Sequence, residues 1–205
     1  MNKDEQGNFY YSKKQGDLES KPAQFDFYFM DHHFKFNTDA GVFSKNYIDY
    51  GSFVMLNNFK PNDLEYPILD MGAGYGPLGI VISVLYNKHT VMAEINERAY
   101  NLILKNIEEN KSDSEAYNSD LYEKITDDMK FSSVVTNPPI RAGKEVINKI
   151  YDGAYLHLVS KGELWVVIQK KQGAPSTKDY LTNLFGNCEI VKRDKGYYIL
   201  KSIKE

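Results

Sequence analysis

The sequence predicts an α/β fold with a mostly parallel sheet. Short apolar runs alternate with longer amphipathic stretches between residues 67 and 185, which is the pattern of strands joined by crossover helices. The last two strand-like runs, 188–191 and 197–201, have no helix between them and are expected to pair antiparallel at one edge. The length of 205 residues, with 42% hydrophobic and 26% charged residues, fits one globular domain.

The N-terminal part of the chain predicts an arm and a hairpin. Residues 1–24 are polar with little periodicity, so we expect an arm ahead of a domain that spans residues 25–205. Aromatic residues alternate with other residues across 25–36, which predicts a short β-hairpin with His32 and His33 in its turn. Neighbouring side chains on a strand point to opposite faces, and no cysteine or further histidine supports a metal site. We therefore expect two exposed histidines and no metal.

The remaining elements follow from apolar spacing. The stretch 46–59 carries an imperfect apolar stripe before Pro61, which predicts a helix. Beyond it, uninterrupted apolar runs predict strands, and stretches with apolar residues three or four apart predict helices. The predicted strands are 67–71, 90–95, 115–118, 131–136 and 163–168, besides the edge pair, and the predicted helices are 76–86, 96–109, 144–158 and 178–185. We therefore expect a sheet of seven strands, with no linker that divides the chain.

The composition excludes several classes of protein. The formal net charge of −3, from 25 basic and 28 acidic residues, argues against a general nucleic-acid coat. The single cysteine, Cys188, cannot form an internal disulfide, which favours a reducing cytoplasm. No apolar run is long enough to span a membrane, and the N-terminus lacks the apolar stretch of a signal peptide. We expect a cytoplasmic protein with no membrane partner.

The segment Asp70–Gly76, DMGAGYG, marks the turn from a strand into the next helix. Glycine suits a tight turn that needs positive φ and lets a ligand approach the backbone. The dinucleotide pattern G-x-G-x-x-G would require glycine where the chain has Pro77, and no G-x-x-x-x-G-K-[ST] pattern occurs. The segment therefore favours a nucleotide-like ligand over NAD or a P-loop phosphate, although a plain glycine-rich turn is the alternative.

Two acidic residues lie at the end of a later strand or just after one. Glu94 ends the second strand of the alternating series, where a carboxylate can accept hydrogen bonds from both hydroxyls of a ribose. Its alternative is an exposed carboxylate at a strand end. Asp120 follows the next strand at the same edge and could accept from an exocyclic adenine amine, or could cap a helix.

The segment Asn137-Pro138-Pro139-Ile140 follows the fourth strand. Its two prolines remove two backbone donors and stiffen the loop, whereas the Asn137 side-chain oxygen and the neighbouring carbonyls remain acceptors. Rigid acceptors suit an exocyclic amine with two N–H bonds to satisfy, and they orient its lone pair toward an electrophile. A simple turn is the alternative, because Asn-Pro commonly begins one.

Together these segments resemble a class I S-adenosylmethionine-dependent methyltransferase of the amino-methylating kind. The stretches 38–45 and 48–52, with 137–144 and 165–175, narrow the resemblance to the small methyltransferase domain of ribosomal RNA guanine-N2 methyltransferases in their stand-alone bacterial form. The likeness covers roughly residues 25–202. It implies a Rossmann-like fold and S-adenosylmethionine as the cofactor.

The resemblance also implies a role for each motif residue. The residues implied to bind the cofactor are Asp70, Gly72, Ala73, Gly74, Gly76, Glu94, Asp120 and Asn137, with Glu94 at the ribose and Asp120 at the adenine. The implied catalytic segment is Asn137, Pro138, Pro139 and Ile140, in which Asn137 and Pro138 hold the target amine. Adenine-methylating enzymes place an aromatic residue where this chain has Ile140, so Tyr75, Phe43 or an aromatic residue of another loop is expected to replace the stacking.

The expected reaction is a direct displacement, in which the amine attacks the methyl carbon of the sulfonium and positioning dominates. Guanine-N2 methylation of ribosomal RNA, free or in a subunit, is the first function. The alternatives are adenine-N6 methylation of RNA or DNA, methylation of a protein glutamine amide, and a degenerate fold that only binds. The enzymes that act on glutamine resemble Asn-Pro-Pro-Tyr and carry a helical N-terminal domain, and this chain has neither feature.

The charge of the chain is unevenly distributed. Residues 1–136 carry 13 basic and 21 acidic side chains, whereas residues 137–205 carry 12 basic and 7 acidic ones. The residues expected to face RNA are Arg141, Lys144, Lys170 and Lys171, with ordinary solvated lysines as the alternative. The chain is thus compatible with a site-specific RNA enzyme whose positive charge lies beside its substrate loop.

Overall fold

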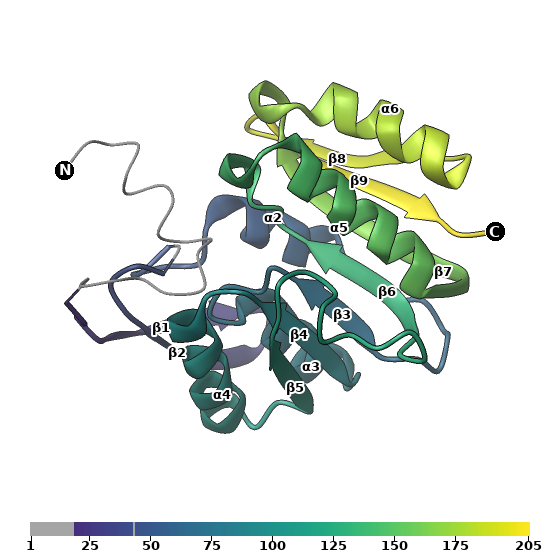
Figure 1. Cartoon of the computed structure of the whole chain (residues 1–205). Helices are drawn as coiled ribbons and strands as arrows, with labels where there is room; N and C mark the ends of the chain where they lie inside the picture. Colours follow the sequence, from purple (N-terminus) through teal and green to yellow (C-terminus); the bar gives the residue numbers. More distant parts are fainter. Residues whose placement is uncertain (1–18, 43) are drawn as a thin grey trace.

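The computed structural model describes residues 19–42 and 44–205 (Figure 1). Its main strands are β3 (Ile68–Met71), β4 (Thr90–Glu94), β5 (Ser114–Asn118), β6 (Phe131–Thr136), β7 (Leu158–Gln169), β8 (Glu189–Asp194) and β9 (Tyr197–Ile203). They form one seven-stranded sheet in the order β5-β4-β3-β6-β7-β9-β8. The strands from β3 to β7 pair in parallel, and β9 pairs antiparallel with β7 and β8. The predicted α/β fold and its antiparallel C-terminal edge are confirmed.

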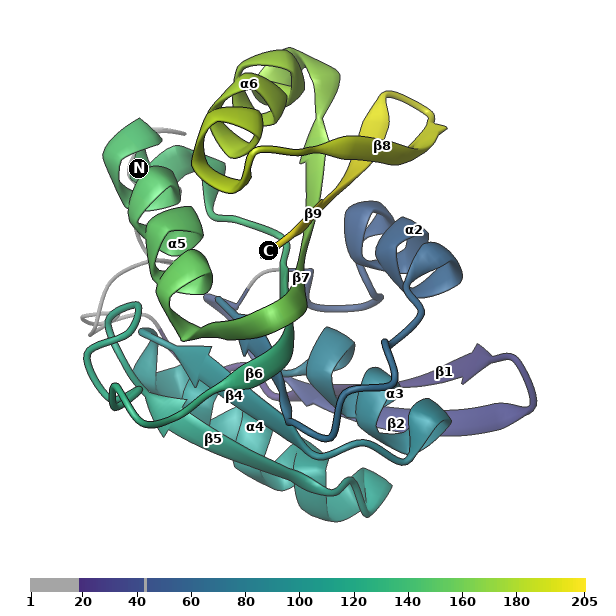
Figure 2. The same ribbon diagram turned by 90° about the vertical axis from the view of Figure 1, so that its right-hand side faces the viewer.

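Helices cover both faces of the sheet (Figure 2). They are α2 (Tyr50–Asn58), α3 (Pro77–Tyr86), α4 (Glu97–Asn110), α5 (Lys144–His157) and α6 (Ala174–Phe185), with short 3-10 turns η1 (Ile140–Ala142) and η2 (Lys170–Gln172). One apolar cluster joins α2, α3 and α4 to the sheet, and a second joins α5 and α6 to its other face. Val134 and Val135 of β6 are completely buried on opposite faces, as expected for a central parallel strand.

Three elements begin four or five residues away from their predicted starts. The helix α2 begins at Tyr50, because Asp49 caps it by accepting a hydrogen bond from the Ser52 N–H. The helix α6 begins at Ala174, four residues before the predicted start. Its Pro175 stands in the first turn, where the missing N–H sacrifices no helical hydrogen bond. The strand β7 also begins earlier than predicted, at Leu158.

The N-terminal hairpin is present and consists of β1 (Ala23–Phe29) and β2 (His32–Thr38). Its inner face carries phenylalanine side chains that enter the core beside α3 and α4. The predicted position of His32 and His33 in the turn is wrong: both lie in β2, and the turn is formed by Met30 and Asp31. Both histidines are exposed, and His33 contacts Asp26 across the hairpin at 2.6 Å. Because β1 begins before the predicted boundary at residue 25 and residues 1–18 lie outside the described residues, the separate arm stays a prediction.

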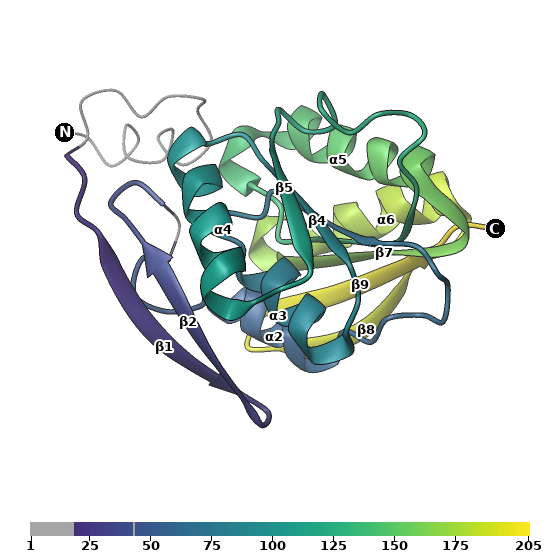
Figure 3. The same ribbon diagram turned by 90° about the horizontal axis from the view of Figure 1, so that it is seen from below.

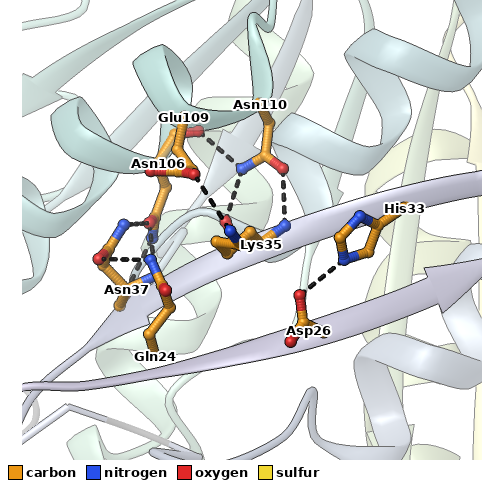
Figure 4. A network of polar contacts seen from close by, with 8 residues as sticks. All are labelled: Gln24, Asp26, His33, Lys35, Asn37, Asn106, Glu109 and Asn110. Atoms are coloured by element: carbon orange, nitrogen blue, oxygen red, sulfur yellow. Dashed lines mark hydrogen bonds and ion pairs between the residues drawn. The ribbon is translucent and has the colours of Figure 1, made fainter.

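Two asparagines of α4 bind the edge of the hairpin (Figure 4). Asn110 Oδ1 accepts from the Lys35 N–H at 2.9 Å, and Asn110 Nδ2 donates to the Lys35 carbonyl at 2.9 Å. Asn106 makes the same pair of contacts with Asn37, at 2.7 and 3.0 Å. Four residues of a helix rise about 6 Å and two residues of a strand about 6.7 Å, so the two amides match successive edge groups of β2. Figure 3 shows the hairpin running alongside α4 as a result.

Asn106 also contacts the glycine segment, which is residues 70–76 at the end of β3 and in the loop that follows it. Its Nδ2 donates to the Tyr75 carbonyl at 2.9 Å, and its side chain is completely buried. A single amide therefore connects the hairpin, α4 and the glycine segment. This connection holds the backbone of the glycine segment at Tyr75.

Candidate active site

A cavity of about 900 Å³ opens at the carboxyl ends of the parallel strands. The ends of β3, β4 and β7 contribute Asp70, Glu94 and Gln169 to its wall, and Asn137 follows β6. The strands β3 and β6 are neighbours from which the sheet extends in opposite directions. Open α/β sheets bind their ligands in the crevice at such a switch point.

Asp70 is a buried carboxylate at the base of the cavity. It is 1% exposed, and its Oδ2 accepts from the Gly79 N–H at 2.9 Å. Burial raises the pKa of Asp70 to about 7, against the effect of the Gly79 hydrogen bond and with a further contribution from the Glu94 charge. A positively charged ligand group beside Asp70 would therefore stabilise the ionised form.

The glycine segment presents bare backbone to the cavity. Gly72 and Gly74 have φ values of 76° and 61°, and a Cβ at either position would meet no atom within 4 Å. The open space and the positive φ together explain glycine at both sites. Gly76, with φ of 94°, instead faces the interior, where a Cβ would lie 3.0 Å from Ile80 Cδ1. Ala73 also lines the cavity, whereas Gly76 does not.

Glu94 binds the glycine segment from the neighbouring strand. Its Oε2 accepts from the Gly74 N–H and its Oε1 from the Asn96 N–H, both at 2.8 Å. It is 6% exposed and lines the cavity. Burial raises the pKa of Glu94 to about 7, although backbone N–H groups of Asn96, Gly74 and Ile95 oppose the shift. The exposed strand-end alternative is excluded by this burial.

Asp120 lies outside the cavity wall. It is exposed, and its carbonyl accepts from the Glu123 N–H in a turn, so it does not cap a helix. The neighbouring residue Ser119 donates its N–H to the Glu94 carbonyl, which keeps this loop at the same sheet edge. The structure therefore brings Asp120 to the predicted edge without joining it to the other predicted residues, and its adenine role stays a prediction.

The Asn-Pro-Pro segment lines the same cavity as the glycine segment. Asn137, Pro138, Ile140 and Arg141 line the cavity, whereas Pro139 does not. Asn137 Nδ2 donates to Asp49 Oδ1 at 2.9 Å and to Ser52 Oγ at 3.1 Å. These two partners were not expected from the sequence, although an aspartate just before an apolar run is a common N-cap signal.

The cavity wall also carries three aromatic residues that the sequence did not single out. Tyr47 is 66% exposed and lines the cavity together with Tyr50 and Tyr197. The rings of Tyr50 and Tyr197 lie 5.7 Å apart, and Lys195 Nζ lies 4.9 Å from the centre of the Tyr50 ring. The expectation that Tyr75 stacks on a base is not supported, because Tyr75 is 2% exposed and its ring packs against Phe25 and Phe36. Phe43 lies outside the described residues.

The predicted RNA-facing residues are all exposed, but only Arg141 lines the cavity. Lys144 begins α5, and Lys170 and Lys171 lie in η2, between the cavity residues Gln169 and Gln172. Within residues 19–42 and 44–205, no group of three or more His, Cys, Asp or Glu side chains is placed to bind a metal ion. Over the same ranges, no helix has the length and apolar character needed to cross a bilayer.

Comparison with known proteins assigns the chain to a family. Residues 33–201 match the model of the methyltransferase small domain. The chain is 42% identical over 197 residues to the Bacillus subtilis (strain 168) protein named "Uncharacterized protein YbxB", across 95% of this chain and 98% of that protein. It is 27% identical over 181 residues to the ribosomal RNA large subunit methyltransferase G of Psychromonas ingrahamii, across 83% of this chain and 46% of that one.

A solved structure has the same fold. The T. thermophilus 16S rRNA N2 methyltransferase RsmC, in complex with AdoMet and guanosine, superposes with a TM-score of 0.82 at 24% identity, over 94% of this chain and 53% of that one. The chain spans about half the length of the curated ribosomal RNA methyltransferases that it matches. The fold and the family match confirm the predicted resemblance to class I S-adenosylmethionine-dependent methyltransferases. The chain belongs to the methyltransferase small domain family.

Proposed function

We propose that the chain transfers a methyl group from S-adenosylmethionine to an exocyclic amine of RNA, with guanine N2 of ribosomal RNA as the target. The observation that carries the proposal is the pairing of an open glycine segment with Asn137 across one cavity. The match to the methyltransferase small domain and the ribosomal RNA methyltransferases among the relatives support the reaction and the class of substrate.

The residues at the ends of β3 and β4 fit this cofactor. Bound S-adenosylmethionine would supply a methyl group on a positively charged sulfur. Gly72 and Gly74 leave space where any other residue would place a Cβ, so an extended ligand can lie against the loop. Asp70 offers a buried carboxylate to the methionine part, and Glu94 offers one to the ribose hydroxyls. Both acids become easier to ionise when a ligand supplies hydrogen-bond donors or positive charge.

Asn137 and Pro138 act on the target amine. The side-chain oxygen of Asn137 and a carbonyl of the Asn-Pro-Pro segment accept the two amine protons, which leaves the nitrogen lone pair free to point at the methyl carbon. Transfer would exchange the carbon–sulfur bond of the bound cofactor for a nitrogen–carbon bond, and the proton lost by the amine would pass to water. Because no side chain becomes a nucleophile, orientation provides most of the acceleration.

Tyr47 is suited to holding the base. Its exposed ring stands at the wall of the cavity, where an unstacked nucleotide could lie against it. Stacking of a base on an aromatic side chain contributes about 1–3 kcal/mol. This contact replaces the π-face that Ile140 lacks. A paired base would first have to leave its helix, so exposed or single-stranded nucleotides are the favoured targets.

Nucleoside analysis tests the proposal. Purified protein is incubated with labelled S-adenosylmethionine and with either RNA or ribosomal subunits from cells that lack the gene, and digested RNA is analysed by mass spectrometry. We expect labelled N2-methylguanosine, and we expect Asn137→Ala to transfer methyl groups only at a small residual rate. Labelled N6-methyladenosine would refute the guanine assignment. An absence of calorimetric binding at millimolar S-adenosylmethionine would refute the methyltransferase activity itself.

A further inference from the structure

We propose that Asp49 and Ser52 are positioning residues that decide which end of the Asn137 side-chain amide is available to substrate. The inference rests on the proposed function and adds a determinant of substrate chemistry. Asp49 and Ser52 belong to the cap and first turn of α2, and Asn137 follows β6, so the contact joins elements that are far apart in sequence.

Both side-chain amide protons of Asn137 are used in hydrogen bonds to α2 and its cap. An asparagine Nδ2 carries two hydrogens. In this structure Nδ2 donates to Asp49 Oδ1 at 2.9 Å and to Ser52 Oγ at 3.1 Å. The planar amide therefore directs its Oδ1 away from α2. A ligand in the cavity meets an acceptor on Asn137 and no donor.

The Asp49 carboxylate makes this orientation strongly preferred. The two ends of an asparagine amide have nearly the same shape, so a rotation by half a turn meets little steric resistance. It would, however, place the amide oxygen against the Asp49 carboxylate and exchange a charge-assisted hydrogen bond for a repulsive contact. A rotated amide would also point its N–H groups at the N–H groups of a substrate amine. Asp49 and Ser52 thus select a nucleophile that donates hydrogen bonds.

Asp49 has two roles, because it caps α2 and also orients Asn137. Its Oδ1 also accepts from the Ser52 N–H at 3.1 Å, which caps α2. Gly51 allows this turn to lie against the sheet, because a Cβ there would stand 2.9 Å from Tyr197 Cε1 and 3.1 Å from Asp49 Oδ1. The orientation of Asn137 therefore depends on the close approach of α2 to β9.

Substitutions that keep the cap can separate the two roles. Serine and asparagine both cap helices about as well as aspartate, but only asparagine is long enough to keep an acceptor near Asn137. We expect Asp49→Ser to lower kcat by about 10- to 100-fold, the range for a hydrogen bond to a charged group. Its S-adenosylmethionine Kd and unfolding midpoint should stay close to those of the wild type. Asp49→Asn should have a kcat at least about tenfold higher than that of Asp49→Ser, and Ser52→Ala should lower kcat by less than Asp49→Ser does.

A double-mutant cycle decides whether Asp49 acts through Asn137. In an Asn137→Ala background, Asp49→Ser should cause no further loss of kcat. An equal loss in both backgrounds, or a loss in Asp49→Asn as large as in Asp49→Ser, would overturn the positioning role.

A measurement that does not depend on methyl transfer separates this inference from the proposed function. In a ¹⁵N-labelled protein, the Asn137 Nδ2 protons, assigned by their absence in Asn137→Ala, should exchange slowly in the wild type and rapidly in Asp49→Ser/Ser52→Ala. Equal exchange in both proteins would refute the inference even if methyl transfer is observed. If exchange behaves as expected but no RNA is methylated, the orientation stands and the proposed reaction fails.

Discussion

Replacing Asn106 by alanine should be among the most costly polar substitutions in the chain. The buried side chain of Asn106 bonds the N–H and the carbonyl of Asn37, the Asn37 side chain and the Tyr75 carbonyl. A buried carbonyl left without a donor costs about 1–3 kcal/mol, and each bond to the half-buried Asn37 contributes about 0.5–1.5 kcal/mol. Alanine returns about 0.7 kcal/mol through its helix propensity. We therefore expect Asn106→Ala to lower the free energy of unfolding by at least about 2 kcal/mol.

Urea unfolding followed by circular dichroism measures this loss. A decrease of that size moves the urea midpoint by about 1–2 M, if the slope m is unchanged. Asn110→Ala is the matched control, because Asn110 makes the equivalent pair of bonds to Lys35 at a half-buried position and should lose only about 1 kcal/mol. Asn106→Asp should be worse than alanine, since its carboxylate would face two carbonyl oxygens. Equal midpoints for Asn106→Ala and Asn110→Ala would refute this account of the network.

Four further outcomes are expected. The pKa values of Asp70 and Glu94 are both raised to about 7, so the ligand-free folded state retains protons that the unfolded chain releases near pH 4. The thermal midpoint of the ligand-free protein should therefore fall as pH rises from about 4 to about 7. A midpoint that rises over this range would contradict the shifts. S-adenosylmethionine affinity, measured by calorimetry, should increase through the same pH range, and Glu94→Gln should weaken binding and flatten this dependence. Tyr47→Ala should weaken RNA binding by about 10-fold because the base loses its stacking partner, while the S-adenosylmethionine Kd is unchanged; unchanged RNA binding in a filter assay would exclude the stacking role. A Lys170→Ser/Lys171→Ser variant should bind RNA with a shallower salt dependence, by about 0.7 on a log–log plot for each phosphate that is no longer neutralised, and an unaltered slope would place both lysines outside the RNA surface.

Local sequence signals predicted most of the fold, and the misses have physical causes. The strand β6 was predicted with its observed bounds because Phe131, Val134 and Val135 lie in a short run of β-branched and small residues that ends at the Asn-Pro-Pro segment. The start of α6 was missed because Pro175 suggests a break, although the first turn of a helix tolerates proline. The start of α2 was missed because the apolar residue Ile48 extends the predicted stripe toward the N-terminus. In the structure the helix begins only after Asp49, which is its N-cap.

The site was predictable where its residues stand at the carboxyl ends of parallel strands. Asp70 and Glu94 lie at the ends of strands and Asn137 follows one, and parallel strands bring such residues to one edge, so their meeting could be expected from the sequence. The bond between Asp49 and Asn137 joins residues 88 positions apart, and no periodicity encodes it. Tyr75 was misjudged for a related reason: its burial depends on the hairpin phenylalanines Phe25 and Phe36, which reach it only in the folded chain.

The asparagine contacts of α4 restrict where the hairpin can change length. Each amide must meet one particular residue of β2, so an extra residue between Lys35 and Asn37 would displace one amide whenever the other stays paired. The same extra residue would turn one set of phenylalanine side chains toward solvent, because strand faces alternate. The exposed turn at Met30 and Asp31 carries neither constraint. Insertions, grafted loops and affinity tags within the hairpin therefore belong at that turn, where they leave both amide contacts and the glycine segment in register.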